Sequence, residues 1–213
     1  MNIETFGDWL ARWPLIAILR GIKPGEAVDI ATILVETGFC IVEVPLNSPE
    51  PYASIVRLSK RFGHRVLVGA GTVTDWEQVR KVADAGGRII VMPHADERIV
   101  EAAKRHNLYV VPGFATPSEG FRMIDAGADA IKLFPAEANP PKALKAMRAV
   151  LPKEVPILPV GGITPDSMKD YWNAGADGFG LGSALYKPGD DAAKVTQKAA
   201  DFRIALEALP KKP

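Results

Sequence analysis

Eight short apolar segments recur along this chain, and their spacing constrains the fold more strongly than any other feature. Neighbouring segments begin roughly 20–26 residues apart, which is the repeat length of one buried strand followed by one helix. The segments span residues 15–19, 41–46, 66–68, 89–92, 109–111, 130–134, 157–160 and 178–181. The pattern therefore predicts eight strands that alternate with helices.

The sequence between these segments carries signals that start helices. Thr116 and Thr164 each precede a proline, and a capping hydroxyl followed by a first-turn proline is typical of a helix N-terminus. Thr74 or Asp75 can cap the helix that follows the third segment. Residues 190–209 are predicted to form a long final helix.

Strands that alternate with helices pair in parallel and are buried on both faces. Eight such units in 213 residues fit a single α/β domain over residues 1–213, a compact (β/α)8 TIM barrel. Within it, residues 1–13 are expected to form a short N-terminal helix and residues 210–213 a polar tail. An open, doubly wound sheet remains the alternative, because periodicity alone does not show that a sheet closes.

Composition and charge argue against several classes of partner. The formal net charge is +1, which gives no sign of binding to nucleic acid or to an anionic membrane. No apolar run approaches the ~18 residues that span a bilayer, and the first residues lack the apolar core of a signal peptide. Cys40 is the only cysteine, so no internal disulfide is possible. We expect a soluble, cytoplasmic protein.

Lys132 lies in the middle of the apolar segment 130–134. A lysine ammonium is rarely buried, because removing its charge from water is costly. Lowering the pKa from ~10.4 to about 7 relieves that cost and leaves a neutral amine, which can form a Schiff base with a carbonyl compound. The alternative is that Lys132 pairs with a carboxylate or extends toward solvent at a strand end.

In a barrel of this type, functional side chains lie at the carboxyl ends of the strands. Arg20, Glu43 and Lys132 lie in or directly after predicted strands, whereas most other charges fall in predicted helices. Their convergence at one end of the barrel predicts a functional site. The alternative is that Glu43 forms a buried pair with Arg20 or Lys132. The same strand ends contain Thr72, Pro93, Gly113 and Phe134.

Glycines mark the ends of the last two predicted strands. Gly161-Gly162 follows the seventh strand, and Gly182-Ser183 follows the eighth. Loops at these two places commonly bind phosphate through free backbone N–H groups, so we expect a phosphorylated ligand. The alternative is that the glycines only permit tight turns. The three histidines lack the spacing of metal ligands, so neither a metal site nor a cofactor is predicted.

Five segments resemble, in the same order, the class I aldolases that cleave 2-keto-3-deoxy-6-phospho-sugar acids, the KDPG/KHG aldolase family. They are residues 19–22 (LRGI), 42–49 (VEVPLNSP), 68–73 (VGAGTV), 131–137 (IKLFPAE) and 159–162 (PVGG). Gluconate-type members typically have arginine at the position of Asn47 and threonine at that of Val160. The two departures in this chain resemble the phosphogalactonate-type subgroup instead.

The resemblance implies a reaction as well as a fold. Lys132 would form an iminium with the C2 ketone of 2-dehydro-3-deoxy-6-phospho-D-galactonate, and Glu43 would act as general acid and base. Cleavage of the C3–C4 bond would release D-glyceraldehyde 3-phosphate and leave an enamine that becomes pyruvate. Because the iminium serves as the electron sink, no metal ion or cofactor is implied. The resemblance also implies a homotrimer.

Substrate-binding residues follow from the same resemblance. A guanidinium and a hydroxyl are suited to the carboxylate, and free backbone N–H groups to the phosphate. The residues implied are Arg20 and Thr72 for the carboxylate, Pro93 and Phe134 for the pocket walls, Val160 for discrimination at C4, and Gly161, Gly162, Gly182 and Ser183 for the phosphate.

Three alternative functions stay open at this point. The nearest is the same cleavage with the phosphogluconate epimer, which differs only at C4, as the main substrate. A different class is a phosphosugar isomerase or epimerase in which Lys132 is an electrostatic partner and Glu43 the base. The third is a phosphosugar-binding barrel without catalysis. The last two predict no covalent adduct on Lys132.

Overall fold

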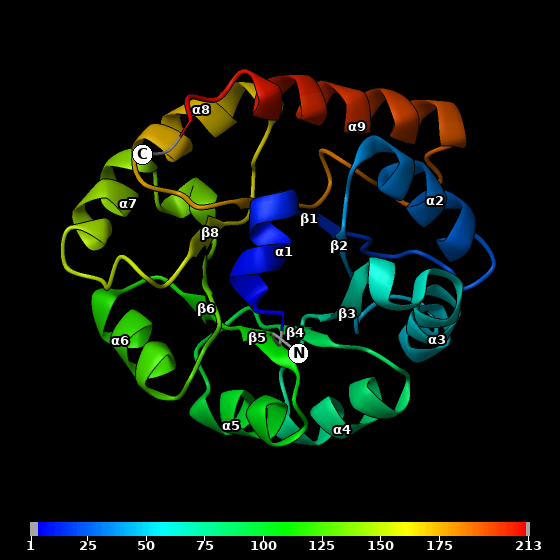
Figure 1. Ribbon diagram of the computed structural model, residues 1–213, viewed down its shortest axis with the longest axis horizontal. Helices are drawn as coiled ribbons and strands as arrows, with labels where there is room; N and C mark the ends of the chain where they lie inside the picture. Colours follow the sequence, from blue (N-terminus) through cyan, green and yellow to red (C-terminus); the bar gives the residue numbers. More distant parts are fainter. Residues whose placement is uncertain (1–3, 212–213) are drawn as a thin grey trace.

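The computed structural model describes residues 4–211 and consists of parallel strands surrounded by helices (Figure 1). The strands are β1 (Leu15–Ile18), β2 (Ile41–Pro45), β3 (Leu67–Gly71), β4 (Ile89–Val91), β5 (Tyr109–Val111), β6 (Gly113–Phe114), β7 (Ile131–Leu133), β8 (Ile157–Pro159) and β9 (Phe179–Leu181). The α-helices are α1 (Phe6–Arg12), α2 (Ala27–Thr37), α3 (Pro51–Phe62), α4 (Trp76–Asp84), α5 (Glu97–Arg105), α6 (Pro117–Asp125), α7 (Pro141–Arg148), α8 (Pro165–Asn173) and α9 (Ala192–Glu207). Short 3-10 helices cover Gly63–Arg65 and Ala136–Ala138. The predicted alternation of strands and helices is confirmed, except that an unpredicted short strand, β6, follows β5 without a helix between them.

The strands form a six-stranded sheet in the order β5-β4-β3-β2-β1-β9 and a three-stranded sheet in the order β6-β7-β8. Pro112 lies between the end of β5 and the start of β6. The strands are interrupted there because proline has no N–H to donate to a neighbouring strand. A parallel bridge between Val160 and Gly180 joins the end of β8 to β9. The result is a curled α/β sheet with helices outside it. Closure into a complete (β/α)8 barrel stays a prediction.

Helix starts follow the capping signals of the sequence. Thr116 and Thr164 are the N-caps of α6 and α8, each with a capping box and a proline in the first turn. Asp75, rather than Thr74, caps α4. The final helix is shorter than predicted, because Asp191 caps it and it ends at Glu207.

Helix α1 lies across the centre of the ring of helices in Figure 1. Trp9 on this helix is fully buried against a cluster that includes Ile16, Ile41 and Leu67, residues at the starts of β1, β2 and β3. α1 therefore covers the amino ends of the strands and leaves the carboxyl ends open. Residues 1–3 and 212–213, which belong to the predicted N-terminal helix and C-terminal tail, lie outside the described residues.

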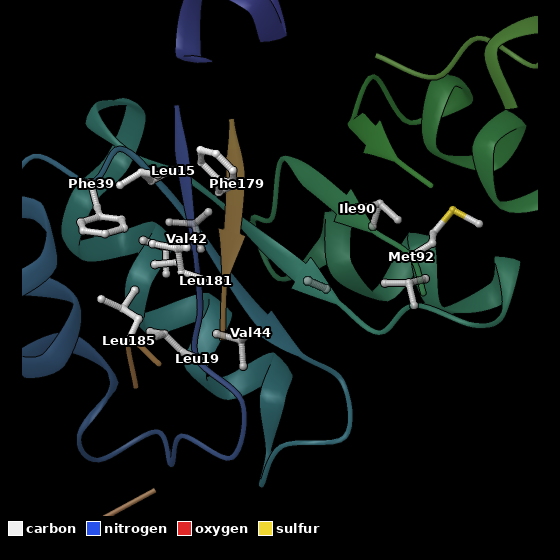
Figure 2. Packing of buried hydrophobic residues seen from close by; sticks show 14 of the residues in the cluster. Leu15, Leu19, Phe39, Val42, Val44, Ile90, Met92, Phe179, Leu181 and Leu185 are labelled. Carbon is white, nitrogen blue, oxygen red and sulfur yellow. The ribbon is translucent and has the colours of Figure 1, made fainter. Parts of the chain in front are cut away.

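Side chains alternate between two faces of each strand. One set packs outward against the helices, and Figure 2 shows Val42, Val44, Phe179 and Leu181 from this set. The other set faces the enclosed interior of the curled sheet. Within residues 4–211, no helix is long and apolar enough to cross a membrane.

Candidate active site

Lys132 is the central residue of β7, and its side chain points into the interior. Its neighbours Ile131 and Leu133 belong to the outward cluster, so alternation along the strand turns Lys132 to the opposite face. Only 5% of the residue is exposed. The Lys132 ammonium lies 4.6 Å from the centre of the Phe134 ring, which stands two residues further along the same face.

Glu43 on β2 follows the same pattern. Val42 and Val44 pack outward, and Glu43 faces the interior with 1% of its surface exposed. Its Oε2 atom has no hydrogen-bond partner among the described residues. A Cβ placed on Gly71 of β3 would lie 2.0 Å from that oxygen, so the glycine provides the space that the carboxylate occupies.

The two buried groups have shifted pKa values. Burial raises the pKa of Glu43 to about 7, against the opposing effect of the Lys132 and Arg20 cations. Burial lowers the pKa of Lys132 to about 8, with Glu43 opposing this change and Arg20 adding to it. Lys132 forms no ion pair within residues 4–211, which disfavours the interpretation that it is half of a structural pair. At pH 7, roughly one Lys132 in ten is then a neutral amine, several hundred times the fraction in an ordinary lysine.

Arg20 lies beside these groups and is held by two neighbouring elements. Its Nη1 donates to Oδ1 of Asn47 at 2.7 Å, and its Nη2 donates to Oγ1 of Thr72 at 3.3 Å. Thr72 adopts a left-handed backbone conformation with φ of 53°, which is uncommon for a β-branched residue. The guanidinium is therefore fixed in place by residues that follow β2 and β3.

A cavity of about 840 Å³ lies at the carboxyl ends of the strands. It brings together eight of the predicted site residues: Arg20, Lys132, Phe134, Val160, Gly161, Gly162, Gly182 and Ser183. Glu43, Thr72 and Pro93 are absent from its wall in the described structure. Glu43 lies deeper, Thr72 contacts Arg20, and the Pro93 carbonyl packs close to Gly113.

The glycines at the end of the cavity differ in what they require. Gly161 and Gly162 have φ of 104° and 66°, and a Cβ on Gly162 would lie 2.5 Å from Cγ of Glu137. These two are explained by backbone conformation and packing. Gly182 is different, because its φ is ordinary and nothing lies within 4 Å of a Cβ added there. Open space beside a glycine in a cavity wall suits the close approach of a ligand to the backbone.

Several cavity residues were not predicted from the sequence. They are Ile18, Gly21, Glu137, Ile163, Thr164, Ala184, Tyr186, Lys187 and Pro188. Glu137 lies within the 131–137 segment that carries the family resemblance. Lys187 belongs to the loop after β9, beyond the predicted site residue Ser183. The length of that loop was the one signal that could have directed attention to it.

Comparison with known proteins adds an independent finding. A family model described as "Aldolase: KDPG and KHG aldolase" matches residues 7–198. The chain is 43% identical over 196 residues to the probable 2-dehydro-3-deoxy-6-phosphogalactonate aldolase of Rhizobium meliloti strain 1021, covering 92% of each chain. It is 42% identical over 195 residues to the 2-dehydro-3-deoxy-6-phosphogalactonate aldolase of Escherichia coli strain K12, covering 92% of this chain and 95% of the relative. A solved structure described as native KDPGal superimposes with a TM-score of 0.91 and 40% identity, over 97% of this chain and 98% of that one.

Proposed function

The chain belongs to the KDPG and KHG aldolase family and is an aldolase, and from this premise we propose its substrate and mechanism. The substrate is 2-dehydro-3-deoxy-6-phospho-D-galactonate, and the products are pyruvate and D-glyceraldehyde 3-phosphate. The observation that carries the mechanism is the interior position of Lys132, desolvated and without an ion-pair partner among the described residues. Such an amine is available as a nucleophile near neutral pH.

In this mechanism the Lys132 amine attacks the C2 ketone, and loss of water gives an iminium. The C3–C4 bond breaks as its electron pair moves to the iminium nitrogen, which releases the aldehyde and leaves an enamine. Protonation of the enamine at C3 and hydrolysis release pyruvate and restore the amine. Glu43 supplies and removes the protons, a role supported by its raised pKa of about 7 and its free Oε2 atom.

The remaining site residues hold the substrate in this proposal. Arg20 and Thr72 bind the carboxylate of the keto acid, while Phe134 and Pro93 wall the keto-acid part of the pocket. The backbone around Gly161, Gly162 and Gly182 binds the phosphate together with the Ser183 hydroxyl. The N-terminus of α8, which follows Gly162, adds the favourable end of a helix dipole for an anion.

Two residues favour the galactonate configuration. Val160 lines the cavity and offers no hydrogen bond to a C4 hydroxyl. Asn47 accepts a hydrogen bond from Arg20, at a position where gluconate-type members typically have arginine. The phosphogluconate epimer is the second candidate substrate, because it differs only at C4. The galactonate names of two relatives that are 43% and 42% identical support the first candidate.

The proposal extends to closure of the sheet, assembly and location. We place the two sheets in one closed barrel, supported by the Val160–Gly180 bridge on one side and the continuous chain through Pro112 on the other.

We also propose a cytoplasmic homotrimer, as the family resemblance implies. Native mass spectrometry that records a mass other than three chains would refute the trimer.

Borohydride reduction in the presence of pyruvate tests the mechanism. Intact-mass measurement should show one reduced pyruvate adduct per chain, and peptide mapping should place it on Lys132. An unmodified protein, under conditions that trap a known class I aldolase, would refute the Schiff base and favour an isomerase, an epimerase or a non-catalytic binding protein. Assays with both epimers then identify the preferred substrate.

A further inference from the structure

Lys187 is an exposed residue of the loop between β9 and α9, and it lines the cavity. Within residues 4–211 it forms no ion pair. The next two lysines along the chain, Lys194 and Lys198, both pair with Asp190, at 2.7 Å and 2.5 Å. Lys187 is therefore a cation without an ion-pair partner among the described residues, in the wall of a cavity that faces solvent.

The backbone of Lys187 is held firmly in place. Its N–H donates to Oδ2 of Asp190 at 2.9 Å, and its carbonyl accepts from the Asp190 N–H at 3.0 Å. Asp190 has a side chain that is 3% exposed, so this anchor is buried. On the other side, the Tyr186 hydroxyl donates to Oε1 of Glu26 at 3.2 Å. A fixed backbone with a free ammonium is suited to a ligand that arrives from the cavity.

The other charged side chains of the cavity wall do not supply a cation for the phosphate group. Lys132 is assigned to the ketone, and Arg20 is held by Asn47 and Thr72. Glu137 packs against Gly161 and Gly162, so its negatively charged carboxylate repels an anionic ligand at this glycine pair. A phosphate bound at this glycine pair needs a cation to offset that repulsion.

We propose that Lys187 binds the phosphate group of the substrate and thereby favours phosphorylated over unphosphorylated sugar acids. This inference rests on the proposed function, because it names a further binding residue of the same site. Lys187 acts on the end of the substrate that does not react. Its loss should therefore weaken binding of the phosphorylated substrate without impairing attack by Lys132 on a ketone.

Three variants and two substrates test the role of Lys187. In Lys187→Gln, kcat/KM for the 6-phosphorylated acid should fall about tenfold, chiefly through KM, because a charge-assisted hydrogen bond is lost. The value for the same acid without phosphate should stay within twofold of wild type, as should pyruvate trapping on Lys132. Lys187→Arg keeps the charge and should restore most of the lost kcat/KM. Lys153→Gln removes an exposed lysine before β8, near α1, and should behave as wild type.

Two results would overturn the inference. One is an equal loss with both acids in Lys187→Gln, which would assign Lys187 to the keto-acid end. The other is no loss with either. A binding measurement with glycerol 3-phosphate separates this test from the test of the reaction. Glycerol 3-phosphate should bind Lys187→Gln about tenfold more weakly than it binds wild type, whether or not the wild type traps pyruvate. Failure of the wild type to trap pyruvate would refute only the proposed function.

Discussion

Replacing Glu43 with glutamine should raise the fraction of Lys132 that is neutral and nevertheless lower the rate of turnover. The Glu43 carboxylate raises the pKa of Lys132, while burial and Arg20 lower it. Without the anion, that pKa should fall below about 8. Because about one-tenth of the amine is already neutral at pH 7, the neutral fraction can rise at most about tenfold. Loss of a general acid and base costs ~10²–10⁴-fold, so the second effect dominates and kcat falls.

Two assays separate these effects. Competitive labelling with trace acetic anhydride, read by mass spectrometry of the peptide that contains Lys132, gives the pKa of the amine in each variant. Steady-state kinetics with the phosphorylated acid give kcat. The control is Glu36→Gln, which removes an exposed carboxylate on α2 and should change neither quantity.

Either of two results would refute this reasoning. An unchanged or higher Lys132 pKa in Glu43→Gln would mean that the carboxylate exerts no effect on the amine. A fall in kcat of threefold or less would assign proton transfer to another group, such as a carboxylate or phosphate of the substrate.

Four further outcomes are expected. Lys132→Arg should abolish both pyruvate trapping and cleavage, because arginine stays protonated; near-normal turnover would show an electrostatic role instead. Gly71→Ala places a methyl group 2.0 Å from the Glu43 Oε2 position, so kcat should fall by about 10²-fold with pyruvate binding retained, as measured by kinetics and trapping. Folding raises the pKa of Glu43 from 4.5 to about 7, so its stabilising contribution is complete below pH 4.5 and lost as pH rises through 7. Chemical denaturation should therefore show that the free energy of unfolding of Glu43→Gln, relative to that of wild type, rises by up to about 3 kcal/mol between pH 4.5 and pH 8. Val160→Thr should shift the kcat/KM ratio of the two epimers toward gluconate by about 1 kcal/mol, and an unchanged ratio would remove Val160 as the discriminator.

The interior of this fold could be predicted from the sequence because its signals are local. Lys132 and Glu43 each interrupt an apolar run, and in a strand buried on both faces a single charged residue must face either the helices or the interior. The strand β6 (Gly113–Phe114) was not predicted, because two residues after a proline are too few to show a periodic apolar pattern. Lys187 was missed because loop residues follow no periodicity, and only three-dimensional structure brings them to a cavity.

The closest relation between sequence and chemistry lies in two short stretches, Val42-Glu43-Val44 and Ile131-Lys132-Leu133. In each, two aliphatic side chains pack outward against the helices and hold the charged residue between them in the interior. The two strands lie in different sheets, so the curl of the fold, rather than strand pairing, brings their charges within electrostatic reach. Removing both charges from water is unfavourable, and the apolar packing of the neighbouring side chains offsets this desolvation free energy. In the proposed mechanism, the same burial that lowers the pKa of Lys132 also makes its amine available as a nucleophile, at a cost to stability.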